Sequence, residues 1–209
     1  MTNKESAAQE RLAKLQAEHR DLTREVEDLR EFMQSMTRLI EAAESPQRET
    51  EALSLLEQVL DNAIRAIGAK DGSLLVPDDN GELVFVLVRG ESPKGSLIGR
   101  RLPANKGIAG WVAANRRATI VNNVPVDDRF YPELDVELDY RTNSLLAAPL
   151  IGGGQMLGVI EVINKANGKL FSTGNQTLLT LMCRFAGELL YSMITDANLT
   201  QNVRSARRA

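Results

Sequence analysis

Apolar residues in the first forty positions recur with alternating steps of three and four, which is the spacing of the a and d positions of a coiled coil. No Pro or Gly interrupts the series, which runs for about four and a half heptads. The pattern predicts one long coiled-coil helix over residues 1–44. Its a and d positions are Ala8, Leu12, Leu15, His19, Leu22, Val26, Leu29, Met33, Met36 and Ile40.

The apolar stripe of this helix needs a partner. A helix of this length extends roughly 55 Å or more at 1.5 Å per residue, which exceeds the width of a small domain. We therefore expect two chains to pair along it, and folding back onto the same chain is the alternative. Glu25 at a g position and Arg30 at the next e position can pair between parallel chains, which weakly favours a parallel homodimer and leaves the antiparallel arrangement open.

The pattern changes after a break at Pro46. Helical spacing over residues 53–67 ends at Gly68, and a period of two, typical of strands, follows over residues 71–90 with Asn80-Gly81 as the turn. Further along we expect a short helix, a short strand, an apolar hairpin and a last helix. These elements span residues 108–115, 119–121, 144–164 and 175 to about 204.

The order of these elements indicates the α+β class, with one antiparallel sheet and helices packed on one face. We divide the chain into the coiled-coil helix (1–44), a globular domain (50–195) and a C-terminal helix extension or tail (196–209). Residues 122–143 are polar, carry Pro and show little periodicity. Irregular segments of that length inside a compact domain are uncommon and tend to be functional.

Composition narrows the function classes. The formal charge of −3 gives no basic face for nucleic acid, and the single cysteine, Cys183, excludes an internal disulfide. The N-terminus lacks the apolar core of a signal peptide, and no apolar run approaches the roughly 20 residues that span a bilayer. We expect a cytoplasmic protein that contacts neither nucleic acid nor membrane.

Three motifs resemble one known family. The stretches GIAGWVAANRRATIVNNV (107–124), RTNSLLAAPL (141–150) and GVIEVINK (158–165) are similar to the signature segments of GAF domains. These are the small-molecule sensor modules of cyclic-nucleotide phosphodiesterases, adenylyl cyclases and bacterial regulators. The resemblance covers residues 53–190, about two thirds of the chain, and implies a GAF-like fold with a ligand pocket under a lid.

The subclass of GAF domains that binds cyclic nucleotides carries an Asn-Lys pair, then Phe, then an acidic pair that is thought to pair with the lysine and brace the lid. Here Asn164, Lys165 and Phe171 match, while Asn175 and Gln176 replace the acids. An amide still accepts a hydrogen bond from an ammonium group but loses the opposing charge. A substitute carboxylate could come from Asp127, Asp128 or Glu161.

The resemblance also places ligand contacts, with core packing as the alternative for several of them. Ser73 and Val88-Arg89 correspond to positions beside a purine base, and the amides of Ile108 and Ala109 correspond to those that face a phosphate at a helix N-terminus. Arg89 departs from the acid usual there, because a guanidinium only donates. The full candidate set is Ser73, Val88, Arg89, Ile108, Ala109, Tyr131, Asp135, Thr142 and Glu161.

Several relatives within the family are excluded by residue type. Bilin-binding GAF domains need a pocket cysteine, whereas Cys183 falls among apolar positions of the last helix and is expected in the core. Haem sensors need a pocket histidine, and the only histidine, His19, belongs to the coiled-coil series. We expect no metal site and no covalent cofactor. We also expect no enzymatic activity, because no nucleophile–base–orienter set can be assembled without a histidine in the domain, and a hydrolase that uses carboxylates alone is the alternative.

Two functions follow from the sequence. The first is a signalling module that binds a small molecule, with cAMP or cGMP as the leading candidates, and transmits occupancy through a dimeric helical bundle to a separate partner protein. The second is a ligand-free GAF domain used for dimerisation or as a scaffold. The changed acidic pair and Arg89 favour the second function, and the strand motifs favour the first.

Overall fold

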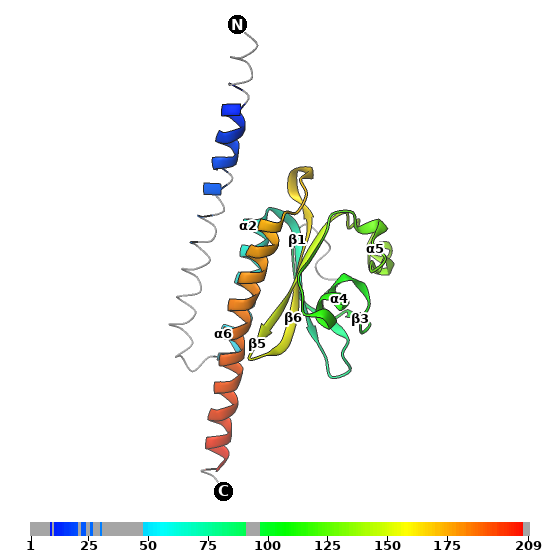
Figure 1. Cartoon of the computed structure of the whole chain (residues 1–209). Helices are drawn as coiled ribbons and strands as arrows, with labels where there is room; N and C mark the ends of the chain where they lie inside the picture. The colour runs from blue at the N-terminus through cyan, green and yellow to red at the C-terminus, as the bar shows by residue number, and fades with distance from the viewer. Residues whose placement is uncertain are drawn as a thin grey trace.

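The computed structural model describes residues 48–90 and 97–206, together with residues 9, 11–20, 22–23, 26 and 30 of the N-terminal segment (Figure 1). Those N-terminal residues are helical, and Leu12, Leu15, Leu22 and Val26 are more than half exposed. The other apolar positions of the predicted coiled coil lie outside the described residues. Pairing of two chains along this segment therefore stays a prediction.

Six antiparallel strands form one sheet in the order β3-β2-β1-β6-β5-β4. The predicted hairpin joins the two strands β5 and β6, and Gly153 and Gly154 between them both have positive φ, which suits a tight turn. The strands are β1 (Ala69–Pro77), β2 (Leu83–Gly90), β3 (Arg101–Leu102), β4 (Thr119–Val121), β5 (Leu145–Gly152) and β6 (Gln155–Lys165).

Two long helices, α2 (Arg48–Ile67) and α6 (Thr173–Ala206), lie side by side on one face of the sheet, which we call the helical face (Figure 1). Their inward side chains and the strands build a closed apolar core that includes Leu60, Leu146 and Leu179, all fully buried. Residues 196–206 continue the backbone of α6 without a break.

The close approach of α6 to the sheet depends on two glycines. A Cβ on Gly187 would lie 2.2 Å from the carbonyl oxygen of Ile151, and a Cβ on Gly152 would lie 1.9 Å from that of Gly187. Thr173–Thr195 has a mean hydropathy of 1.2 and is the one described helix apolar and long enough to cross a membrane. One side of this helix packs on the sheet, whereas Leu181, Phe185 and Ile194 on it are exposed.

The other face of the sheet, which we call the cavity face, is covered by α4 (Gly107–Asn115), the 3₁₀ turn η1 (Val124–Val126) and α5 (Glu133–Glu137) (Figure 1). A second turn, η2 (Ala166–Gly168), follows β6. The predicted α+β class with an antiparallel sheet is confirmed. The long helices share one face as expected. The expectation that all helices pack on one face is corrected, because α4 and α5 lie on the opposite face.

Candidate functional site

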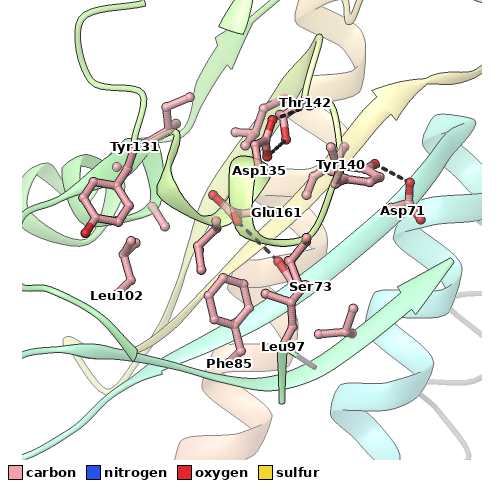
Figure 2. Close-up of a pocket in the computed structure, with 18 of the residues that line it drawn as sticks. Asp71, Ser73, Phe85, Leu97, Leu102, Tyr131, Asp135, Tyr140, Thr142 and Glu161 are labelled. Carbon is pink, nitrogen blue, oxygen red and sulfur yellow. Dashed lines mark hydrogen bonds between the residues drawn. The ribbon is translucent and has the colours of Figure 1, made fainter. Parts of the chain in front are cut away.

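A cavity of about 100 Å³ lies between the cavity face and the segments 97–109 and 130–142 (Figure 2). We call residues 130–142 the lid segment. The walls are mostly apolar and include Phe85, Leu97 and Leu102. Because one water molecule needs roughly 10–15 Å³ of such space, the cavity can hold several waters or a compact organic group.

The structure brings together all the predicted ligand positions except one. The polar members of this group come from β1, the lid segment and β6, and the apolar members come from β2 and the first turn of α4. The positions that line the cavity are Ser73, Val88, Ile108, Ala109, Tyr131, Asp135, Thr142 and Glu161.

Arg89 is the exception, and its expected place beside a ligand is corrected by the structure. Successive side chains on a strand point to opposite faces, so Val88 and Arg89 cannot both face the cavity. Arg89 lies on the helical face, where its guanidinium donates to Glu57 at 2.7 Å and lies 3.3 Å from Asp61 of α2. It links β2 to α2 instead of contacting a ligand.

Glu161 and Ser73 sit opposite each other on β6 and β1 and form the polar floor of the cavity. Both are buried, and the Ser73 hydroxyl donates to Glu161 Oε2 at 3.3 Å (Figure 2). Burial raises the pKa of the Glu161 carboxyl to about 7, although the bond from Ser73 acts in the opposite direction. Glu161 therefore changes its charge within the physiological pH range.

Asp135 in α5 and Thr142 at the end of the lid segment hold this segment in a closed loop. The Asp135 carboxylate accepts from the Thr142 backbone N–H at 2.7 Å and from the Thr142 hydroxyl at 2.8 Å (Figure 2). Both carboxylate oxygens thus serve the lid itself. This contact favours a structural role for Thr142, which the sequence left as an alternative.

The first turn of α4 borders the cavity through Gly107, Ile108 and Ala109. No side chain caps this end of the helix. Gly110 lets the helix approach the preceding loop, since a Cβ there would lie 2.8 Å from the backbone of Asn105. The partial positive charge of this helix end suits an electron-rich group in the cavity.

Sequence reasoning missed Asp71 and Tyr140. The Tyr140 hydroxyl donates to Asp71 Oδ2 at 2.5 Å (Figure 2). The same hydroxyl accepts from Asn164 Nδ2 at 2.8 Å. Asp71 lies near the start of β1 and is 3% exposed, and Tyr140 lies near the C-terminal end of the lid segment. A signal was present in both cases, because an acid inside an apolar strand and an aromatic in a polar loop are each unusual choices.

The residues of the Asn-Lys-Phe motif have two different roles, one at the lid segment and one at the helices. Asn164 does hold the lid segment, since its Oδ1 accepts from the Asn143 N–H at 2.8 Å and its Nδ2 donates to the Arg141 carbonyl at 2.8 Å. Lys165 instead donates to the Ile67 carbonyl and to Asn175 Oδ1, the latter at 3.1 Å.

The expected bracing of the lid by Lys165, Phe171 and Asn175 is therefore corrected. Phe171 is buried in the core of the helical face, with the Lys165 ammonium 5.8 Å from its ring centroid. The three residues join the end of α2, the end of β6 and the start of α6. Asn175 accepts from Lys165, so an amide does take the place of the family's acid.

The other carboxylates proposed as partners of Lys165 have different roles. Arg129 donates to both oxygens of Asp127, which lowers the pKa of that carboxyl, and its guanidinium stacks 4.8 Å from the Trp111 ring centroid. Glu161 lies on the floor of the cavity. Cys183 is buried in the core of the helical face, as predicted, and burial raises the pKa of its thiol.

The comparisons with known proteins agree with this architecture. A family model described as GAF domain matches residues 49–190. Among curated proteins, the rod cGMP-specific 3',5'-cyclic phosphodiesterase subunit alpha of Bos taurus is 28% identical over 88 residues, which cover 42% of this chain and 10% of that protein. The dual 3',5'-cyclic-AMP and -GMP phosphodiesterase 11 of Drosophila melanogaster is 35% identical over 88 residues, covering 42% of this chain and 6% of that protein. The chain thus spans a small part of these relatives.

Solved structures share the fold at low sequence identity. The GAF domain from a phosphoenolpyruvate-protein phosphotransferase of Coxiella burnetii superposes with a TM-score of 0.65 at 21% identity, covering 84% of this chain and 98% of that one. The free methionine-R-sulfoxide reductase from Neisseria meningitidis, in complex with its substrate, gives a TM-score of 0.58 at 14% identity, covering 79% and 91%. These similarities establish the fold alone.

Proposed function

The chain belongs to the GAF domain family, and from this membership we propose that it is a non-catalytic regulatory module whose cavity binds a small molecule. One observation carries the proposal. The cavity face keeps the polar side chains of Asp71, Ser73, Thr142 and Glu161 buried around a space within otherwise apolar walls. Pockets that bind small molecules combine apolar walls with a few placed polar groups in this way.

A purine cyclic nucleotide, cAMP or cGMP, is the leading ligand candidate. The similarity to a cGMP-specific phosphodiesterase and to a dual cyclic-AMP and -GMP phosphodiesterase supports it. The first turn of α4 would face the phosphate, and Glu161 would accept from the base. Because the cavity of about 100 Å³ is smaller than a nucleotide, this proposal requires the lid segment to open on binding. No lysine, arginine or histidine is among the described residues that line the cavity, so the phosphate would depend on backbone amides.

The absence of catalysis is part of the proposal. Among the described residues that line the cavity there is neither a cysteine nor a histidine, so a nucleophile–base pair would have to be built from carboxylates and hydroxyls. Asp135 is engaged by Thr142 and Glu161 is held by Ser73. These contacts support binding more than proton transfer to a substrate.

Signal output would pass through helices to a separate protein in the cytoplasm. We expect a homodimer formed by the N-terminal coiled coil and α6. Support comes from apolar side chains that the single chain leaves exposed on both elements. These residues are Leu12, Leu15, Leu22, Val26, Leu181, Phe185 and Ile194. The Lys165 contacts give the end of β6 a direct connection to both α2 and α6.

A ligand-free scaffold is the second candidate. The placement of Arg89 on the helical face favours it, because a position that the family often uses for the ligand here serves the connection between β2 and α2. In that case the cavity would be a packing defect, and the same dimer would still form.

Thermal unfolding of the full chain with a panel of compounds separates the two functions. The panel contains cAMP, cGMP, nucleosides, amino acids and other common metabolites. A ligand at a hundredfold excess over its Kd stabilises the folded state by about 2.7 kcal/mol, which shifts Tm by several degrees. No shift with any compound would refute the binding module and favour the scaffold.

A pair of variants on α4 tests whether a ligand-induced shift in Tm comes from binding in the cavity. Ala109→Leu fills space in the cavity, whereas Ala114→Leu adds the same atoms to an exposed position of the same helix. We expect the first variant to lose the ligand-induced shift and the second to keep it. Equal shifts in both variants would place the ligand elsewhere.

A further inference from the structure

Glu161 is the one acid among the described cavity residues whose hydrogen bonds leave a carboxyl oxygen without a donor. Its side chain is 6% exposed, and the described residues supply one donor, the Ser73 hydroxyl, which reaches Oε2. Oε1 has no hydrogen-bond donor among the described residues, although it belongs to a buried carboxyl. A buried acceptor without a donor destabilises the fold, so such a group needs an explanation.

The surroundings of Glu161 hold further acids and no base. The other titratable side chains that line the cavity are Asp71, Tyr131, Asp135 and Tyr140, and no lysine, arginine or histidine lines it among the described residues. Tyr140 donates to Asp71, and Thr142 donates to both oxygens of Asp135. The open acceptor on the floor therefore belongs to Glu161.

The neighbours of Glu161 on the same face are apolar. Val88, Leu145 and Ile163 surround the floor, and Phe85 and Leu97 close one wall. An anion placed there would lose its hydration and meet carboxylates. A metal ion is a poor alternative, because among the described residues no group of three or more acidic, His or Cys side chains is arranged to hold one.

We propose that the natural ligand of this cavity places an N–H donor, either a cationic amine or amidine or the N–H edge of a heterocycle, against Glu161, with a compact apolar body between β2 and the lid segment. The proposal rests on the proposed function and adds the ligand's chemical class. A ligand that is only an anion, whether carboxylate or phosphate, does not fit. The cyclic nucleotides fit only in the orientation that directs the base, and not the phosphate, towards Glu161.

A series of isosteric compounds tests the donor directly. Benzylamine, benzyl alcohol and benzoate have the same ring and similar size but present a cation, a hydroxyl and an anion. Benzene fills an apolar cavity of about 150 Å³, so at about 100 Å³ this cavity admits such a ring only with a small outward movement of the lid segment. We expect benzylamine to raise the Tm of the full chain, benzyl alcohol to raise it less and benzoate to leave it unchanged.

The pH dependence gives a second readout. A cationic donor pairs much more strongly with the ionised carboxylate than with the neutral acid, and burial places the pKa of Glu161 at about 7. Benzylamine is protonated throughout the range from pH 6 to 8, so its affinity measured by calorimetry should increase roughly tenfold between these values, with proton release near pH 7. Tighter binding at the lower pH, with proton uptake, would overturn the inference.

Glu161→Gln and Glu133→Gln form a matched pair of variants. The first replaces the carboxylate by an amide of the same shape, and the second removes a charge from an exposed position of α5 outside the cavity lining. We expect Glu161→Gln to bind benzylamine at least tenfold more weakly and to lose the pH dependence, because hydrogen bonds to charged groups are the stronger ones. Glu133→Gln should bind as the wild-type chain does.

The outcomes distinguish this inference from the proposed function. Stabilisation by the metabolite panel together with a response to benzoate equal to that of benzylamine, or with no response to benzylamine at millimolar concentration, would overturn the donor ligand and leave a binding module. No response to any compound in either series would overturn both. Equal binding by wild type and Glu161→Gln would also overturn the role of Glu161.

Discussion

The two faces of the sheet differ in how tightly they are covered and in which side chains they bury. On the helical face, α2 and α6 seal a core in which Leu60, Leu146 and Leu179 are fully buried and the strands contribute almost only apolar side chains. On the cavity face, shorter elements leave a space and keep an acid, Glu161, on its floor. Close packing stabilises a fold, whereas buried polar groups destabilise it and are usually retained at functional sites. The comparison therefore associates stability with the helical face and the proposed binding with the cavity face.

The largest expected difference comes from removing a leucine from each face. Leu179→Ala opens a void in a closed core and should lower the free energy of unfolding by about 2–5 kcal/mol. Leu102→Ala, at a buried position that lines the cavity, enlarges an existing space, so we expect less than half that loss. Urea unfolding of both variants checks this, and equal losses would remove the distinction between the faces.

Glu161 should make the cavity face sensitive to pH. Its pKa is about 7 in the folded chain against 4.5 for an unperturbed glutamate, so the fold prefers the protonated acid. This contribution to stability is fully present below pH 4.5, is lost as pH rises towards 7, and corresponds to a loss on the order of 3 kcal/mol. Glu161→Gln lacks this dependence, so its free energy of unfolding relative to wild type should increase between pH 5 and 8. A difference that stays constant over this range would contradict the burial argument.

Tyr140 should couple the lid segment to the sheet. Tyr140→Phe removes the hydroxyl that donates to Asp71 and accepts from Asn164, and we expect a loss of about 1–2 kcal/mol together with faster amide hydrogen exchange in α5. Tyr131→Phe is the control, because the described residues offer its hydroxyl no hydrogen bond. Equal effects of the two changes would show that the Tyr140 contacts do not hold the lid.

The smallest effect is expected at the exposed ion pair between Arg100 and α5. Arg100, just before β3, forms an ion pair with Glu137 of α5, and both side chains are well exposed to solvent. Arg100→Ala should leave Tm unchanged within error, since exposed ion pairs contribute little to stability, but should increase hydrogen exchange in α5. A marked decrease in Tm would mean that closure of the lid belongs to the cooperative fold.

Most elements of the globular domain could be predicted from periodicity. The strand over residues 119–121 and the glycine turn of the hairpin were found where expected, and the predicted helices agree with α2, α4 and α6 to within a few residues. Period-two and period-3.6 patterns reflect local burial, so they are visible in the sequence. The placement of α5 was not predicted, because its residues in segment 122–143 alternate without a clear period.

The positions of site residues were predicted well where strand alternation defines which side chains face inward. They were predicted poorly where contacts between residues far apart in the sequence set the position. Ser73, Val88 and Glu161 were correctly placed on the cavity face. Arg89 was placed wrongly, although strand alternation alone could have excluded it. Lys165 was misplaced for a different reason, because one of its partners, the Ile67 carbonyl, lies 98 positions away in the chain and ties it to α2.

The amino-acid sequence by itself determined the family, the class of fold and the residues that form each element, because these depend on local spacing and on motifs of adjacent residues. Only the tertiary structure decided that Asn164 holds the lid segment while Lys165 joins the helices, and that Asp71 meets Tyr140 across 69 positions of the chain. Which face a cavity occupies, and which buried acid lacks a donor, depends on how the sheet is covered on each side. That covering is a property of contacts between distant segments, which no local pattern encodes.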